Sequence, residues 1–236
     1  MLIFSPQTIV ILAALLPCAV LLYYIYSHDT IEKEPTGLLI RLFLLGCLST
    51  IPAMIIEMAA SYIMGYLGMQ ETTVVYMLIE NFLVVALAEE GSKRFFLKRG
   101  SWNNPEFNYL FDGVVYSVFV SLGFAGAENI GYIAGFGLEI APMRAVLAIP
   151  LHCICAVFMG HFYGLAKYYE RCGMPDQVRS NRFLSILIPV LIHGFYDFCA
   201  SSDSDVMSIV FLVFVIVMDI IAIRSVKRYS ASDTPL

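Results

Sequence analysis

Long apolar stretches separated by short polar linkers run through almost the whole chain. A helix that crosses a membrane needs about 20 mainly apolar residues, because its backbone polar groups must be satisfied within the segment. Seven stretches approach or exceed that length: residues 9–26, 38–64, 74–96, 113–133, 141–168, 183–200 and 206–223. The pattern therefore predicts an all-α, polytopic membrane helical bundle with about seven transmembrane helices.

The linkers between these stretches carry residues that end helices. Gly, Pro, Asn, Asp and charged residues gather there, as in the segments HDTIEKEPTG and ERCGMPDQVRSN. We expect one integral-membrane domain over residues 1–236, with a core at roughly 24–200 and a seventh span and cytoplasmic tail at 201–236. Because no basic residue precedes the first apolar run, we interpret that run as the first span rather than a cleaved signal peptide.

The composition excludes several classes of protein. Of the 236 residues, 59% are hydrophobic and only 14% are charged, whereas water-soluble domains carry about a quarter charged residues. The net charge of -5 and the lack of a long basic tract exclude nucleic acid as a partner and leave the lipid bilayer. Five of the six cysteines lie inside apolar runs, which is typical of buried thiols rather than disulfides: Cys18, Cys47, Cys153, Cys155 and Cys199.

Lys and Arg residues are distributed unevenly between the two sides of this predicted bundle. If the N-terminus lies outside, 13 of the 14 basic residues fall in or beside inner loops, and Arg144 alone lies at an outer end. Basic residues in short loops are retained on the cytoplasmic side of a membrane. The bias predicts a multi-pass protein of the cell membrane with an N-out, C-in topology.

Polar side chains inside the apolar runs are the candidates for chemistry. An ionisable side chain at the bilayer centre costs about 2.5 to 3.5 kcal/mol on insertion scales, so each one needs a reason to be there. The residues are Glu57, Glu89, Glu90, Glu128, Asn129, His152, His193, Asp197 and Asp219. Glu57 and Asp219 lie nearer the ends of their spans, where snorkelling explains them, and we leave both out of the site.

Glu89 and Glu90 end an apolar run, and each has a cation four residues later, Lys93 and Arg94. Pairing at i, i+4 lowers the cost of burying an acid, so an ordinary turn at the membrane surface is one interpretation. Adjacent residues lie about 100° apart around a helix, so at most one glutamate is expected to point straight into a site. Counted along the helices, Glu89 lies on the cytoplasmic side of the midplane and Glu128 on the outer side.

Glu128 lies about 22 Å along its predicted span, and its nearest basic residue in sequence is Arg144. A hydrogen-bonded packing role is one interpretation, although an acid inside a membrane is a functional candidate by default. Gly123, Ala127 and Gly131 give the same helix a face of small residues that a neighbour can approach closely.

Three histidines lie within the apolar runs. His193 and Asp197 are one turn apart, so the carboxylate can share a metal ion with the imidazole or orient it as a base. His152 lies about 16 Å into its span and His193 about 15 Å into the next, which places both near mid-membrane and favours a shared ligand. His161 is about 180° around the helix from His152 and is expected to face elsewhere.

The order of these residues resembles a known pattern. Glu89 to Lys93 read EExxK, Phe124 to Asn129 read FxxxEN, His152 stands alone in the next span, and His193 to Asp197 read HxxxD. Each motif alone is weak, but four in this order on separate predicted spans resemble the PrsW family of intramembrane proteases. That family is similar to the type II CAAX prenyl endopeptidases and to the non-catalytic scaffold subunit of γ-secretase.

The resemblance covers roughly residues 24–200, including a segment at 28–35 that looks like the family's first cytoplasmic loop. It implies an endopeptidase acting on a single-span membrane protein, with the first cut of a membrane-anchored anti-sigma factor as the reaction. A sigma factor is then released after further proteolysis. The catalytic residues implied are Glu89, Glu90, Lys93, Glu128, Asn129, His152 and His193.

Two schemes of peptide hydrolysis are open to these residues. In one, a Zn²⁺ ion has an open position for water, and Glu89 or Glu90 is the general base. Its ligands would be His152 and His193 with Asp197 or Glu128. In the other scheme no cofactor is present: a buried glutamate activates water, and the histidines with Asn129 stabilise the oxyanion.

Two functions without proteolysis would use the same buried acids and histidines. A proton- or ion-coupled transporter is one, but it predicts a repeat of spans with broken helices, and the sequence shows no convincing one. A non-catalytic membrane scaffold is the other, and it would usually lack the catalytic pair. Because Glu89 and Glu90 are both present, we expect an enzyme.

Overall fold

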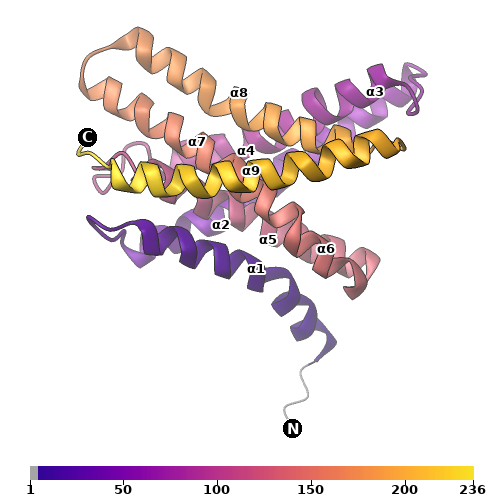
Figure 1. The fold of residues 1–236 in the computed structure, drawn as a ribbon, viewed down its shortest axis with the longest axis horizontal. Helices are drawn as coiled ribbons and strands as arrows, with labels where there is room; N and C mark the ends of the chain where they lie inside the picture. Colours follow the sequence, from indigo (N-terminus) through magenta and orange to yellow (C-terminus); the bar gives the residue numbers. More distant parts are fainter. Residues whose placement is uncertain (1–4) are drawn as a thin grey trace.

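The computed structural model describes residues 5–236, so the first four residues of the expected domain lie outside the described part (Figure 1). Its secondary structure is helical apart from a single β-bridge between Tyr109 and Pro235. In chain order the elements are α1 Pro6–His28, α2 Thr36–Tyr66, α3 Val74–Leu78, the π-helix η1 Ile79–Ala86, α4 Leu87–Ser101, α5 Asp112–Phe136, the 3₁₀ turn η2 Leu138–Ile140, α6 Ala141–Val146, α7 Ala148–Arg171, α8 Pro175–Ala200 and α9 Asp205–Ala231.

Six helical stretches among the described residues are long and apolar enough to cross a membrane. They are Gln7–His28, Thr36–Tyr66, Asp112–Phe136, Leu138–Arg171, Pro175–Ala200 and Asp205–Ala231. The remaining predicted span, 74–96, corresponds to α3, η1 and α4, which follow one another without a loop. The prediction of an all-α polytopic bundle is confirmed.

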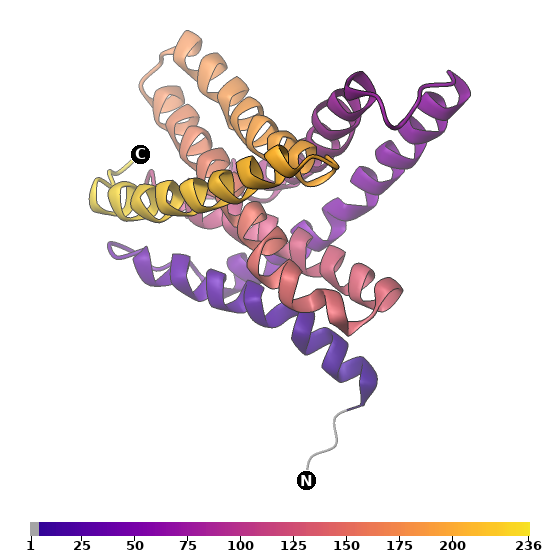
Figure 2. The same cartoon turned by 45° about the vertical axis from the view of Figure 1, so that its right-hand side comes forward.

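Helix α5 lies at the centre of the bundle, against α1, α2 and α7 (Figures 1 and 2). Two glycines let α2 and α5 approach closely, because a Cβ on Gly46 would collide with the Val120 carbonyl and a Cβ on Gly123 with the Phe43 carbonyl. Gly131 has open space around it, so the predicted face of small residues is used only at its start. Small residues at such crossings allow tight packing in a membrane, where lipid provides no hydrophobic driving force.

The π-helix η1 lies directly before the turn that carries the adjacent glutamates. Its wider turn shifts the register of the residues that follow, so a regular α-helical projection from residue 74 misplaces their faces. The Asn81 side chain donates to the Met77 carbonyl oxygen at 2.8 Å and to Ser201 Oγ at 3.1 Å, which ties η1 to the end of α8. A Cβ on Gly194 would lie 2.5 Å from the Phe82 ring, so this glycine lets α8 pack closely on η1.

One end of the bundle gathers three loops and the C-terminal tail. Ser230 Oγ donates to the His28 carbonyl oxygen, Leu236 N donates to the Asn108 carbonyl oxygen at 2.7 Å, and Asn108 Nδ2 donates to Glu32 Oε2 at 3.1 Å. This is the end that the distribution of Lys and Arg assigns to the cytoplasm, and its sidedness stays a prediction.

Candidate active site

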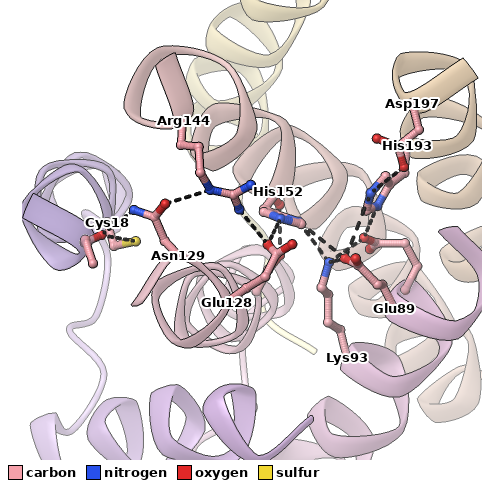
Figure 3. A network of polar contacts seen from close by, with 12 residues as sticks. Cys18, Glu89, Lys93, Glu128, Asn129, Arg144, His152, His193 and Asp197 are labelled. Atoms are coloured by element: carbon pink, nitrogen blue, oxygen red, sulfur yellow. Dashed lines mark hydrogen bonds and ion pairs between the residues drawn. The ribbon is translucent and has the colours of Figure 1, made fainter. Parts of the chain in front are cut away.

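Four buried side chains from three helices converge inside the bundle. Glu89 and Glu90 lie in the first turn of α4, His152 on α7 and His193 on α8, and one ligand atom from each lies within 4.8 Å of the others. Glu90 and His193 are 103 residues apart in the sequence, so only folding brings the four together. Figure 3 shows the surrounding network of polar contacts.

The Lys93 ammonium group lies between these side chains and is fully buried. Its Nζ atom lies 2.7 Å from Glu90 Oε1, 3.0 Å from Glu89 Oε2 and 2.9 Å from His152 Nδ1. It also lies 4.1 Å from the centroid of the Phe124 ring. One lysine therefore offsets the charge of both glutamates, which makes the burial of two adjacent acids tolerable.

The expected pairing of Glu90 with Arg94 is wrong. Arg94 Nε donates to Ser185 Oγ at 2.9 Å, and its guanidinium group lies 4.3 Å from the centroid of the Tyr163 ring. Both glutamates belong to the cluster, and Glu90 contacts Lys93 and His193 there. Lys93 contacts both glutamates, at i-4 and i-3, so Glu90 is paired without Arg94.

Each imidazole contacts a carboxylate outside the central cluster. His152 Nε2 lies 3.0 Å from Glu128 Oε2, and His193 Nε2 lies 3.2 Å from Asp197 Oδ2. His193 Nδ1 faces inward, 2.9 Å from Glu90 Oε1. The contact between His193 and Asp197 agrees with their expected common face, and both carboxylates hold their imidazoles in a fixed orientation.

Glu128 and Asn129 are connected through Arg144, the basic residue nearest to Glu128 in sequence that was not among the expected site residues. Arg144 Nη2 lies 3.1 Å from Glu128 Oε2, and Arg144 Nε donates to Asn129 Oδ1 at 2.7 Å. Asn129 Nδ2 donates to the Ala14 carbonyl oxygen at 3.2 Å, so its amide connects Arg144 to α1 and does not contact either site histidine. The signal that could have identified Arg144 is its position as the one cation at the outer ends of the spans.

Glu89 and Glu128 were expected at different depths in the membrane, and the side chain of His152 connects them. His152 Nε2 contacts Glu128, and Nδ1 on the other edge of the ring lies 3.9 Å from Glu89 Oε2. The two glutamates need not meet, because the imidazole between them contacts both.

A cavity of about 750 Å³ borders the cluster between η1, α6, α8 and α9. Its polar lining includes Glu89, Glu128, Arg144, His152, His193 and Asp197. Its apolar lining includes Leu151, Tyr196, Phe211 and Leu212. Glu90 and Lys93 are not part of the lining, so they lie behind the groups that a substrate would meet.

The residues left out of the site lie elsewhere. Glu57 does not line the cavity. Asp219 lines a separate small void between α7, α8 and α9. His161 stacks on Tyr229 with ring centroids 3.9 Å apart, well outside the cluster. All six cysteines are free thiols, and of the five in apolar runs only Cys47 is not fully buried.

The donor atoms of the central cluster suit zinc. Imidazole nitrogen and carboxylate oxygen are ordinary zinc ligands, and Glu90 Oε2 is a buried carboxylate oxygen without a hydrogen-bond partner among the described residues. Such an atom is costly unless a ligand satisfies it. The inner set differs from the one expected from sequence: it contains both histidines, but Glu89 and Glu90 take the places of Asp197 and Glu128.

Comparisons with known proteins identify the family of the chain. The family model described as PrsW family intramembrane metalloprotease matches residues 34–223. Curated relatives named Protease PrsW include one from Oceanobacillus iheyensis, 35% identical over 92% of this chain and 94% of its own length. Another from Bacillus subtilis is 34% identical over 83% and 84% of the two chains, and one from Geobacillus kaustophilus is 37% identical over 78% and 76%. No solved structure matches the chain.

Proposed function

The chain belongs to the PrsW family of intramembrane metalloproteases, and on that premise we propose that Glu89, Glu90, His152 and His193 form its active site. We further propose that this site cleaves a membrane-anchored anti-sigma factor. The observation that carries the proposal is the juxtaposition of two glutamates and two histidines beside a cavity within the membrane-spanning part of the chain.

The positions of the two glutamates favour different roles for them. Glu90 is fully buried behind the cavity and has an unpartnered oxygen, so we assign it with His152 and His193 to hold zinc. Zinc bound there would act as a Lewis acid on the scissile carbonyl group. Glu89 lines the cavity, where its Oε2 atom can take a proton from the attacking water and return it to the leaving amine.

The surrounding residues act on these groups from outside. Glu128 and Asp197 hold the two imidazoles through their outer nitrogens, which sets the orientation of each ring. Arg144 in turn holds Glu128, and Lys93 offsets the negative charge of the glutamate pair. Asn129 positions Arg144. We assign Asn129 this role in place of the oxyanion stabilisation that the metal-free scheme gave it.

The cavity also supports a membrane protein as the substrate. Its apolar wall is formed by α7, α8 and α9, and α9 is largely exposed on the outside of the bundle. A single-span helix that unwinds beside α9 could therefore bring a peptide bond to Glu89 without leaving the membrane. An anti-sigma factor with one span fits this description, and its identity rests on the family.

Co-expression tests the proposal. A tagged single-span anti-sigma factor should be cut by the wild-type chain and stay intact with Glu89→Gln. Asp219→Asn is the matched control, because it also removes an intramembrane acid but lies outside the cavity. Cleavage that continues with Glu89→Gln would show that Glu89 is not the base. A wild-type chain that cuts no candidate substrate would favour the non-catalytic scaffold.

A further inference from the structure

Three cations gather at the loop end of α2 and α4 without an acidic partner. Arg41 lies on α2, Lys98 and Arg99 lie on α4, and all three side chains are exposed. None of them forms an ion pair with any described residue. Together with Phe95 and Trp102 they line a pocket of about 610 Å³, which contains no carboxylate. We call it the basic pocket.

An apolar groove of about 640 Å³ lies between the same two helical stretches. Pro52 and Ile56 of α2 form one wall, and Leu83 and Leu87 form part of the other. Phe95 lines both the groove and the basic pocket, so the two are adjacent. From residue 83 to residue 95 a helix rises about 18 Å, which is close to one half of a hydrocarbon core of about 30 Å.

We propose that the groove and the basic pocket together bind one anionic phospholipid of the cytoplasmic leaflet. The acyl chain lies along the α2/α4 groove, and the phosphate headgroup is held by Arg41, Lys98 and Arg99. Basic pockets between transmembrane helices at the cytoplasmic surface recognise anionic headgroups. Three unpaired cations without a carboxylate select a net negative headgroup over a zwitterionic one, which brings its own positive charge.

The groove lies against the back of the α4 turn that carries Glu89 and Glu90. Ala88, Gly91 and Ser92 line it, and they alternate with the site residues of the same turn. An acyl chain there would pack on the back of the turn that carries Glu89 and Glu90. Binding of the lipid is nevertheless independent of proteolysis, so it can be tested whether or not a substrate is known.

The single tryptophan of the chain provides a direct probe. Trp102 lines the basic pocket and is the only tryptophan in the sequence. The full chain is reconstituted in phosphatidylcholine vesicles and titrated with phosphatidylglycerol carrying bromine near the headgroup end of its acyl chains. We expect quenching of Trp102 fluorescence that saturates at a low mole fraction and is several-fold stronger than with brominated phosphatidylcholine. Added salt should weaken the preference.

Charge variants decide whether the basic pocket is responsible. The triple variant Arg41→Gln, Lys98→Gln, Arg99→Gln should lose the preference for phosphatidylglycerol. The matched control Arg224→Gln, Lys227→Gln, Arg228→Gln removes as much charge from exposed positions on α9 and should keep it. Arg41→Lys with Arg99→Lys should keep it too, which separates loss of charge from loss of folding.

Three results would overturn the proposal. Equal quenching by the two brominated lipids would show an ordinary lipid annulus at Trp102. A preference that survives in the triple variant would place the anionic site elsewhere. Competition by soluble glycerol phosphate as strong as that by phosphatidylglycerol would show a phosphate site that does not use the groove.

Discussion

Two groups of buried acids lie at different depths of this bundle, and they are stabilised in different ways. At the proposed active site, Glu89 and Glu90 contact a lysine and two histidines beside a cavity. At the loop end, Glu34 Oε2 accepts from the Tyr116 hydroxyl at 2.6 Å, and Asp112 Oδ2 accepts from the backbone N–H groups of Asn108 and Tyr109 at 3.0 and 2.7 Å.

The loop acids are buried among neutral donors and other carboxylates. Burial raises the pKa of Glu34 to about 7 and that of Asp29 to about 6. Neither residue lines the cavity beside Glu89. Glu34 contacts Tyr116 of α5 and so holds the first loop against that helix. A buried acid alone therefore does not mark a catalytic centre. The distinguishing features are convergence from several helices, basic partners and access to a cavity.

The largest effect is expected when the side of the membrane on which each loop lies is tested, because cysteine labelling from one side is all or none. Cysteines introduced at Asn103 and Gly173 should react only with reagent on the cytoplasmic side, and those at Met69 and Ser202 only with reagent outside. The native Cys172 is exposed and should behave like the Gly173 position, so it is replaced for the other measurements. The reverse labelling pattern would contradict the N-out, C-in topology.

Removal of an acid from each group should separate catalysis from structure. Glu89→Gln should lower the cleavage rate by about 10³-fold, since general acid–base groups contribute about 10² to 10⁴. Glu34→Gln should change it less than about two-fold at neutral pH. The rates are measured on reconstituted protein, with thermal unfolding as the control for folding. Equal losses in both variants would remove the distinction.

Zinc content sharpens the comparison further. Purified protein should hold about one zinc per chain, and chelation should stop cleavage. His193→Ala should lose metal and activity together, whereas Asp197→Asn should weaken zinc binding by about 10- to 100-fold, as expected for a group that orients a ligand. Glu34→Gln should keep its metal. Full specific activity without metal would leave a glutamate that activates water directly as the mechanism.

Arg144 should have an intermediate effect, because it acts on Glu128 and not on the substrate. Arg144→Gln is expected to lower kcat/KM by about 10-fold as Glu128 loses its partner. Arg144→Lys should restore only part of this loss, since one ammonium group cannot reproduce the separate Nε and Nη2 contacts. A purely structural role would make the loss of activity follow the loss of thermal stability across both variants.

A further prediction concerns the pH dependence of stability. The pKa of Glu34 is higher in the folded chain than the value of about 4.3 for an unfolded one, so the folded state binds more protons between the two values. Stability should therefore fall by up to about 3 kcal/mol as pH rises from about 4.5 to about 7. Glu34→Gln should flatten this part of the profile in thermal scans, while the exposed Glu71→Gln should not. An unchanged profile in Glu34→Gln would contradict the assignment.

The pattern of apolar residues along the chain was sufficient to predict most of the helices. Runs of about 20 apolar residues predict spans because lipid satisfies no backbone group, and all seven predicted runs are helical here. Residues 74–96 are helical, but the division of this predicted span into α3, η1 and α4 was not foreseen.

The sequence by itself determined which residues were worth considering, because a polar side chain in a bilayer is costly and the cost is visible without a structure. Only the tertiary structure decided what each one contacts. Lys93 bridges both glutamates, Arg144 joins the network, and Asn129 points to α1, away from the histidines. These outcomes depend on the register of helices whose contacting residues lie up to 115 positions apart in the chain. Contacts between distant helices are set by packing, which periodicity within one helix does not encode.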